Sequence, residues 1–381
     1  MGNSNDRTEM DTFKNNYEKR AMDFGERYGK AKFYSKRNNP NEIIMTKDYW
    51  TNNLDESTSY DEMVEVRKDI THENLAKCYV HDVSQENQFF TEFYKHSTAH
   101  EYHDHNLYKE IAARRNTDEN GGEFTENEVW YYANSMVDLD EHLKENSLGT
   151  PHGDLQPKTL MLNEDGNVKF MDNAIVTNKD AYQKCNFQDE YFAPLAPEQL
   201  EDLKVNKVNP ENTFTDKSEV FAIGITSLSA ATGNFPEDYY DWNKREYLQT
   251  KVEEDLESLE GRKSPEQINF IRRCLEHDAE DRWSLSEANE YMKPYKSLAR
   301  QKKLNFMNKK REMTQEIQEN DFFDNQALGH QDVVVDEGVM DAIPMTDEIG
   351  GNDFFDDDNL IHREIVRDEG IEAYGQGDDF F

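Results

Sequence analysis

Apolar residues in the first hundred positions fall in short runs bounded by Gly, Asn and Pro, a pattern that predicts β-strands. The clearest run is Ile43–Met45, and Asn38–Asn41 before it has the composition of a hairpin turn. A second run, Phe89–Tyr94, predicts another strand. Further along, Leu160–Leu162 and Val168–Phe170 flank an Asp-Gly turn and predict a small hairpin.

Helical spacing of apolar residues dominates the rest of the chain. Helices are predicted over residues 60–70, 124–148, 220–231 and 268–275, and from 285 into the 290s. Ser59 with Glu62, and Thr125 with Glu128, have the three-residue offset of a capping box at the starts of the first two. The segment 220–231 is almost entirely apolar and small, so we expect it to be buried on all sides.

This order of elements predicts an α+β fold with two lobes, in which a small β-rich lobe precedes a larger helical one. Four segments are expected: a polar extension (1–16), the β-rich lobe (17–94), the helical lobe (95–300) and a C-terminal tail (301–381). The tail begins with basic residues near 302–311, which are typical of the positive end of a final helix.

The charge is strongly acidic, because 43 Lys and Arg stand against 80 Asp and Glu, a net charge of −37. This charge excludes a general nucleic-acid binder, since phosphates would be repelled. The hydrophobic share is only 35%, but 19 Tyr, 21 Phe and 4 Trp are enough to build a core. A wholly disordered chain is therefore excluded as well.

The acidic charge is concentrated at the C-terminal end, where residues 312–381 hold 21 acidic residues and two basic ones. Paired aromatics among acidic residues, without periodicity, are typical of a disordered segment. We expect them to bind basic-rimmed apolar pockets of partner proteins, with repetition raising avidity. The alternatives are docking onto a basic patch of the same chain and low-complexity drift. The aromatic anchors are Phe322, Phe323, Phe354, Phe355, Phe380 and Phe381.

Three widely spaced cysteines, Cys78, Cys185 and Cys274, fit neither a disulfide framework nor a metal motif and favour a reducing compartment. No run of 18 apolar residues is present, so no transmembrane segment is expected. Gly2 permits N-myristoylation, although Asp6 stands where that motif has Ser or Thr; only this modification would bring a membrane surface into play. The expected setting is cytoplasmic, with a cytoskeletal or ciliary multi-protein assembly as one version of it.

The segment between the two predicted lobes resembles the catalytic loop and metal motif of eukaryotic protein kinases. That family has H-R-D-L-K-P-E-N followed by D-F-G, and this chain has HGDLQPKT at 152–159 and DNA at 172–174. Further motifs keep the family's order, including Ala-Pro-Glu at 196–198 and the start of a central helix at 217–224. The resemblance covers about residues 17–298.

The resemblance implies roles for several residues. Asp154 matches the catalytic base, Lys47 the strand lysine that meets the phosphates, and Asp172 the main Mg²⁺ ligand. Glu92 and Tyr94 match the hinge whose backbone would take adenine. No cofactor is expected with certainty, and ATP with Mg²⁺ would serve any remaining kinase activity.

Other parts of the resembled apparatus are altered. Thr159 replaces the second metal ligand, Gln156 replaces the lysine that neutralises the transferred phosphate, and Gly153 replaces the loop arginine. Of the Gly-rich loop only Gly29 and Gly25 remain, without the G-x-G-x-x-G spacing, and backbone amides wrap phosphates closely only where side chains are absent.

The regulatory-helix carboxylate that should pair with Lys47 is not identified, because Glu62 and Glu65 both lie off register. Glu198 and Arg282, in contrast, match the structural ion pair of the family, and Glu219 stands where the central helix has Asp. Framework residues match while chemistry residues vary.

This contrast favours a catalytically impaired pseudokinase that acts as a scaffold or assembly component. Two alternatives stay open: an active atypical Ser/Thr kinase that transfers the ATP γ-phosphate, and an adaptor that acts through its tail.

Four histidines, at positions 96, 100, 103 and 105, also suggest a metal site, since the first three would share one face of a helix. The alternative is a solvated helix without metal, because no acidic or Cys ligand set completes the site.

Overall fold

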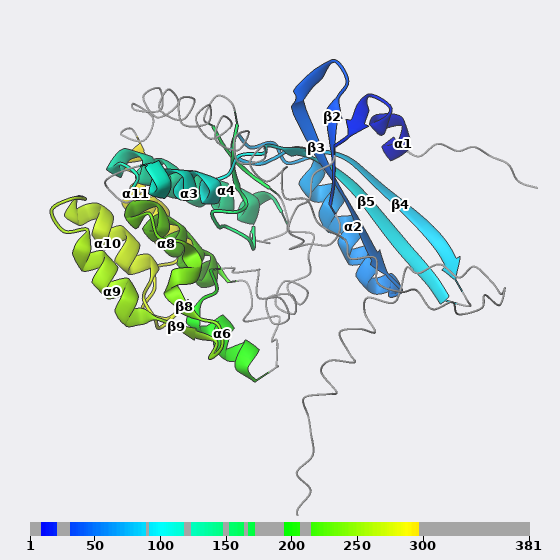
Figure 1. Ribbon diagram of the computed structural model, residues 1–381. Coiled ribbons are helices and arrows are strands. Elements are labelled where there is room, and N and C mark those ends of the chain that lie inside the picture. Colours follow the sequence, from blue (N-terminus) through cyan, green and yellow to red (C-terminus); the bar gives the residue numbers. More distant parts are fainter. Residues whose placement is uncertain are drawn as a thin grey trace, which may run out of the picture. The chain divides into compact units, whose positions relative to one another are not determined.

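The computed structural model describes eight stretches of the chain and gives no account of the residues between them. These stretches are residues 9–20, 31–88, 91–117, 123–147, 152–163, 167–171, 194–205 and 215–296. Together they hold a strand-rich part followed by a helical part, as the hydrophobic pattern predicts (Figure 1).

The strand-rich part is an antiparallel sheet of five strands in the order β1-β2-β3-β5-β4. Its elements are α1 (Glu9–Lys14), β1 (Tyr17–Lys19), β2 (Lys32–Lys36), β3 (Asn39–Thr51), α2 (Leu54–Lys68), β4 (Cys78–Gln88) and β5 (Thr91–Tyr102). The predicted strand Ile43–Met45 is confirmed as the buried middle of β3. The turn before it is tighter than predicted, because only Arg37 and Asn38 separate β2 from β3.

Helix α2 packs along β4 and β5, and Figure 1 shows it lying on one side of the sheet. The prediction that Ser59 caps this helix is wrong. Asn53 is the cap, and its side-chain oxygen accepts hydrogen bonds from the amides of Asp55 and Glu56 at 3.0 and 3.3 Å. Because a helix begins where a side chain first satisfies its free amides, α2 starts one and a half turns before the predicted residue.

The helical part contains the remaining elements. These are α3 (Leu107–Thr117), α4 (Glu126–Asn146), β6 (Leu160–Leu162), β7 (Val168–Phe170), α6 (Pro197–Lys204), α8 (Asp216–Thr232), η1 (Pro236–Tyr239), β8 (Tyr240–Asp241), β9 (Glu246–Tyr247), α9 (Gln249–Ser258), α10 (Pro265–Cys274) and α11 (Leu285–Met292). The capping box of Thr125 and Glu128 is confirmed at the start of α4. The hairpin strands β6 and β7 have the predicted bounds, while residues 164–166 of the turn lie outside the described residues.

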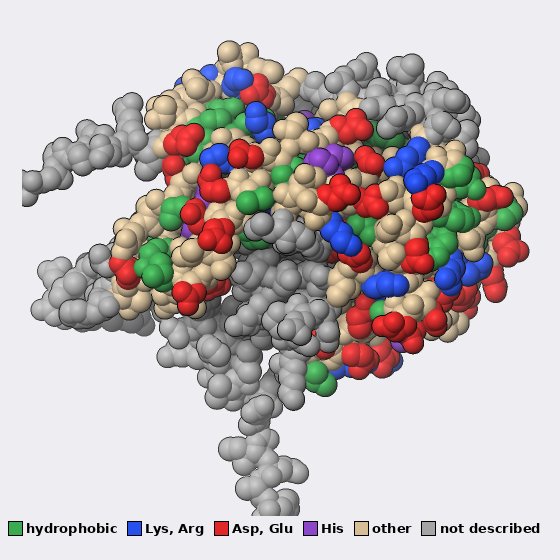
Figure 2. Space-filling model, turned by 180° about the vertical axis from the view of Figure 1, so that it is seen from behind, with side chains coloured by type: hydrophobic (Ala, Val, Ile, Leu, Met, Phe, Trp, Pro, Cys, Tyr) green, Lys and Arg blue, Asp and Glu red, His purple; other side chains and the backbone are tan. Residues whose placement is uncertain are grey.

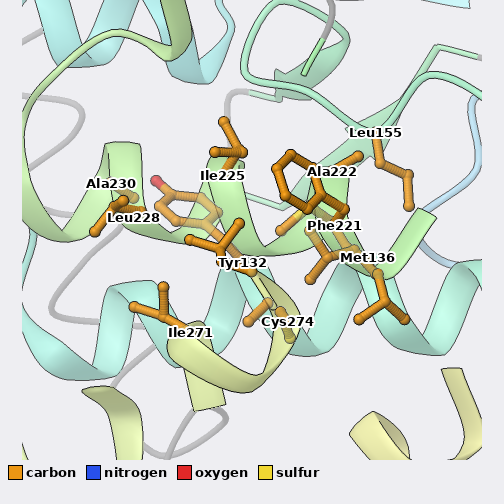
Figure 3. Close-up of a cluster of buried hydrophobic side chains, with 14 of the residues drawn as sticks. Tyr132, Met136, Leu155, Phe221, Ala222, Ile225, Leu228, Ala230, Ile271 and Cys274 are labelled. Carbon is orange, nitrogen blue, oxygen red and sulfur yellow. The ribbon is translucent and has the colours of Figure 1, made fainter. Parts of the chain in front are cut away.

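The core of the helical part is built around α8, as its apolar composition predicts. Every residue from Ser218 to Ala231 is buried, and α4, α10 and α11 surround the helix. Figure 3 shows the side chains that meet there, with Tyr132 and Met136 of α4 facing Phe221 and Ile225 of α8.

Helices α8 and α10 approach closely at Gly224. A Cβ atom placed on this glycine would lie 2.8 Å from the Cys274 Cβ and 2.7 Å from the Leu275 Cδ2. Such contacts are shorter than van der Waals packing allows, so the crossing requires glycine at this position.

The segment after α2 connects the sheet to the β6–β7 hairpin by backbone hydrogen bonds. Phe170 N donates to Asn74 O at 2.6 Å, and Ala76 N donates to Phe170 O at 2.9 Å. The Asn74 amide side chain adds a bond to Val168 O at 3.1 Å. The H-x-N motif therefore fastens the strand-rich part to the strands that follow the loop 152–159.

On the face shown in Figure 2, acidic side chains are spread over the described surface with basic ones between them. This mixed surface agrees with the net charge of −37. Among the helices of the described stretches, none is both long and apolar enough to cross a membrane.

Candidate functional site

The loop 152–159 lies between α4 and β6, and two buried carboxylates hold its backbone. Asp140 Oδ1 on α4 accepts a hydrogen bond from His152 N at 2.8 Å, and Glu219 Oε2 on α8 accepts one from Gly153 N at 3.2 Å. Both carboxylates are almost fully shielded from solvent. They fix the direction of the chain immediately before Asp154, which is the structural role that the resemblance implies for Glu219.

Burial is the largest influence on these two acids. It raises the pKa of Asp140 to about 6 and raises the pKa of Glu219 well above its usual range, and the Asp140 charge adds to the second shift. Arg67, a buried residue at the end of α2, opposes both pKa shifts through its positive charge. A cation on α2 thus helps to balance the acids under the loop.

Gly153 has a φ of 78°, in the left-handed region that residues with a Cβ rarely adopt. The resembled family has arginine at this position, and this chain has the residue for which the conformation costs least. The backbone shape of the loop is therefore compatible with glycine, although the guanidinium is absent.

Asp154 is buried, and its carboxylate accepts a hydrogen bond from the Gln156 side-chain amide. Thr159 is buried as well, and its hydroxyl lies within hydrogen-bond distance of the carbonyl oxygens of Asp154 and Gln156, at 2.5 and 3.1 Å. The loop thus holds its base-position carboxylate next to a neutral amide. The hydroxyl at the second-metal position faces the loop's own backbone.

Lys47 lies on β3 opposite Thr98 of β5. Because side chains alternate along a strand, Lys47 shares one face of the sheet with Met45 and Tyr49. Met45 belongs to an apolar cluster that also includes residues of the helical part, and Tyr49 stacks on Tyr60 of α2 at 4.5 Å between ring centroids. The lysine is half-buried between these two contacts, so its position along β3 fits the predicted one.

An apolar layer joins the sheet to the strands that follow the loop. It consists of Phe33, Ile43, Met45, Ala76, Tyr102, Met161 and Met171. Each of these side chains is buried, and Phe33, Met45 and Met161 are no more than 2% exposed. Met171 immediately precedes the Asp172 position, so the layer reaches the edge of the metal motif.

The prediction of a hinge at Glu92–Tyr94 is wrong. Strand β5 continues to Tyr102, and Glu92 pairs with Asn87 of β4 in the hairpin at the far end of the sheet. Tyr94 pairs with Thr51 in the same region, and its hydroxyl donates to Glu92. The chain passes from the sheet to α3 only after Tyr102, because the strand is twelve residues long.

The interpretation of the histidines as one helix face is also wrong, since His96 and His100 lie within β5. The structure instead brings His96 next to His81 of β4, with the His81 Nε2 and His96 Nδ1 atoms 3.2 Å apart. Both imidazoles are buried below α2, and burial lowers the pKa of His96 to about 4. His81 was not a candidate from sequence, because no local motif marks it; pairing of β4 with β5 is what places it here.

Helix α2 covers this histidine pair with a face that carries no carboxylate. Its buried residues are Ser57, Tyr60, Val64 and Arg67. Glu65 lies at the edge of the helix, where it contacts His81 at 3.1 Å and Lys68 at 3.3 Å. Glu62 is exposed. These contacts show where the two candidate carboxylates lie.

Glu198 and Arg282 form the predicted ion pair, with two contacts at 2.8 and 3.0 Å. The Arg282 side chain is fully buried, and it also donates to three backbone carbonyls. The pair connects the start of α6 to the chain before α11, so the structural motif at 196–198 is held as the resemblance implies.

Several predicted site residues lie outside the described residues. These are Asp172, Gly25, Gly29 and the tail anchors Phe322, Phe323, Phe354, Phe355, Phe380 and Phe381. The described part of the site therefore consists of the loop, Lys47, the apolar layer and the surroundings of α2.

Comparison with known proteins agrees with this arrangement. The family model described as the protein kinase domain matches residues 32–293. Mitogen-activated protein kinase kinase 2 of Arabidopsis thaliana is 30% identical over 156 residues, which are 37% of this chain and 38% of that protein. The hormonally up-regulated neu tumor-associated kinase of Homo sapiens is 27% identical over 169 residues, 43% of this chain and 22% of that protein. The chain thus matches well under half of the length of these relatives.

Proposed function

Because the chain belongs to the protein kinase domain family, we propose that it uses the kinase fold as a catalytically impaired scaffold, a pseudokinase that holds other proteins together. The observation that carries the proposal is the loop around Asp154. Its carboxylate is hydrogen-bonded to the neutral amide of Gln156, at the position where the family has a lysine.

Phosphoryl transfer depends on charge stabilisation more than on covalent chemistry. A neutral amide at 156 supplies no positive charge to a transferred phosphate. Thr159 supplies one hydroxyl oxygen, directed at backbone carbonyls of the loop, where the family has an amide oxygen for the second metal. Both substitutions weaken the electrostatic part of the machinery.

The apolar layer supports the proposal from the nucleotide side. Met45 and Phe33 of the sheet and Met161 of the strand after the loop are packed together and shielded from solvent. A nucleotide entering between these elements must separate them and expose their apolar surface, at about 25 cal/mol per Å². That cost opposes nucleotide binding.

The buried face of α2 adds a third argument. An active kinase pairs its strand lysine with a carboxylate of this helix. Here the positions that face the sheet carry Ser57, Tyr60 and Val64, while Asp61 and Glu65 lie at the edge near His81. The face of α2 is therefore built for packing against the sheet.

The proposal extends to partners. We assign the assembly role to protein partners bound by the fold and by the aromatic anchors of residues 312–381, in a reducing cytoplasmic setting that the widely spaced cysteines favour. Truncation after residue 311 should reduce capture of such partners without changing the melting of the kinase domain.

Thermal unfolding of the full chain with ATP and Mg²⁺ tests the impaired cleft. A ligand at its Kd stabilises by about 0.4 kcal/mol, and one at a hundredfold excess by about 2.7 kcal/mol. For a domain of this size these values correspond to roughly 1–2 °C and 5–11 °C. We expect a shift below about 1 °C at roughly 1 mM ATP.

A radiolabel-transfer assay on a generic protein substrate, with Asp154→Asn as the matched control, completes the test. We expect the same background counts from both proteins. A large melting shift together with transfer that disappears in Asp154→Asn would establish an active kinase and overturn the proposal.

A further inference from the structure

The polar cluster under α2 brings together three metal-ligating side chains that are remote in sequence. His81 and His96 come from neighbouring strands and lie diagonally on the same face of the sheet, since His81 is opposite Thr98. Asp61 comes from α2. One ligand atom from each of these three residues can be chosen so that all of them lie within 4.8 Å of one another.

The distances suit a divalent transition metal. Two nitrogen ligands about 2.1 Å from a tetrahedral Zn²⁺ lie about 3.4 Å apart. The His81 Nε2 and His96 Nδ1 atoms are separated by 3.2 Å, close to that spacing. The Asp61 Oδ1 atom lies 3.7 Å from the nearer His81 nitrogen, so a small side-chain rotation brings the carboxylate onto the same centre.

The partners of the other ring nitrogens favour the tautomers that a metal needs. His81 Nδ1 lies 3.1 Å from the Glu65 carboxylate, which accepts a proton and leaves Nε2 with a lone pair. His96 Nε2 lies 2.8 Å from the Ser57 hydroxyl, which can accept in the same way and leave Nδ1 with a lone pair. Carboxylate and hydroxyl partners of this kind orient metal-bound imidazoles.

The surroundings combine a closed wall with an open edge. Tyr60 packs against His96 at 4.5 Å between ring centroids, and both imidazoles are buried. The side chains of Asp61 and Glu65 are 48% and 50% exposed, so the cluster reaches solvent beside the helix. An ion can enter past the two carboxylates and meet the nitrogens behind them.

We infer that His81, His96 and Asp61 bind a divalent transition-metal ion of the Zn²⁺ class, with Glu65 and Ser57 orienting the imidazoles. Imidazole and carboxylate ligands suit such an ion, and three protein ligands leave one position for water. In the metal-free state one N–H lies between the two rings. On binding, the His96 proton occupies Nε2 in place of Nδ1, so neither imidazole releases a proton to solvent.

The ion would connect α2 to β4 and β5 through three ligands from three elements. Because Arg67 of the same helix balances the acids under the loop 152–159, a fixed α2 also fixes that cation. The metal is therefore a structural clamp on the helix, and its binding is independent of whether the cleft takes a nucleotide.

Cobalt(II) absorption of the full chain, treated first with a chelator, tests the inference. Tetrahedral Co²⁺ with nitrogen ligands absorbs far more strongly in the visible region than Co²⁺ held by carboxylates and water, so the acidic tail does not mask the signal. We expect one such Co²⁺ per chain, displaced by one equivalent of Zn²⁺, and a rise in the unfolding temperature with Zn²⁺.

Variants locate the signal. His81→Gln should abolish the absorption, Asp61→Asn should weaken Zn²⁺ binding at least tenfold, and Glu65→Gln should weaken it about 10- to 100-fold. Glu62→Gln, an exposed carboxylate on the same helix, is the matched control and should change nothing. If His81→Gln does not fold, the partly exposed Asp61→Asn decides the matter. Absence of the band, or a band and a Zn²⁺-induced melting shift that persist in Asp61→Asn, overturns the inference.

Discussion

The Arg282 guanidinium offers the sharpest test of the framework, because the structure accounts for all five of its N–H donors. Two donate to the Glu198 carboxylate, and the others donate to the carbonyl oxygens of Lys217, Glu276 and His277. The Arg282 side chain is fully buried, whereas that of Glu198 is 28% exposed. Removing either partner therefore has a different consequence.

Glu198→Gln leaves a buried cation without its counter-charge, which costs about 3–5 kcal/mol. Arg282→Met removes the charge itself, lets Glu198 turn toward water and leaves three carbonyls short of a donor. At about 1 kcal/mol for each carbonyl, this loss is about 3 kcal/mol. The double variant should cost about 4 kcal/mol, so the coupling between the two sites is about 2–4 kcal/mol.

Urea unfolding of the full chain, followed by tryptophan fluorescence and far-ultraviolet circular dichroism, measures these differences. The single variants should lower the unfolding temperature by roughly 6–20 °C. A loss below about 1 kcal/mol in Glu198→Gln, or costs that simply add in the double variant, would refute the argument that this buried charge needs its partner.

Three further outcomes are expected. Gly153→Ala should cost about 1–2 kcal/mol in urea unfolding, because its φ of 78° is left-handed. Met45→Ala should cost about 2–4 kcal/mol by the same measurement, through the cavity left in the apolar layer. The His72 hydrogen bond lowers the pKa of the Asp138 carboxyl to about 2. The Asp138 contribution, about 1 kcal/mol after discounting for exposure, is present above about pH 4 and lost as pH falls toward 2; in acid titration, Asp138→Asn should flatten this loss.

The sequence predicts the elements whose signals are local. The capping box of Thr125 and Glu128 and the buried composition around Ile223 lie within the helices that they specify, and both predictions are confirmed. The start of α2 is different, because Asn53 and Ser59 are both good caps. The choice between them depends on which turn packs against the sheet, and this is a tertiary effect.

The length of β5 explains the two errors near residue 95. A strand of twelve residues is longer than the usual five or six, and polar positions such as Lys95 and Ser97 resemble the end of a strand. The hinge was therefore predicted one hairpin too early, and His96 was placed on a helix. Only strand pairing shows that this residue faces His81, because the two are fifteen residues apart.

The described loop residues were predictable because the resemblance fixes their order and spacing. What the loop does with them was not, since the hydrogen bond from Gln156 to Asp154 depends on how both side chains are buried. The apolar layer was missed for a similar reason. Met161 and Met171 are ordinary apolar residues of two short strands until the sheet is packed against them.

The backbone bonds of the H-x-N segment have a mechanical consequence. Since Phe170 donates to Asn74 and accepts from Ala76, strand β7 continues the main-chain hydrogen-bonding of the segment that leads into β4. Any swinging of the sheet against the helices must pivot about this seam, because opening it would break paired amides. Deuterium uptake at Ala76 and Phe170 should accordingly be slow and concerted, and nearly the same whether or not neighbouring segments move.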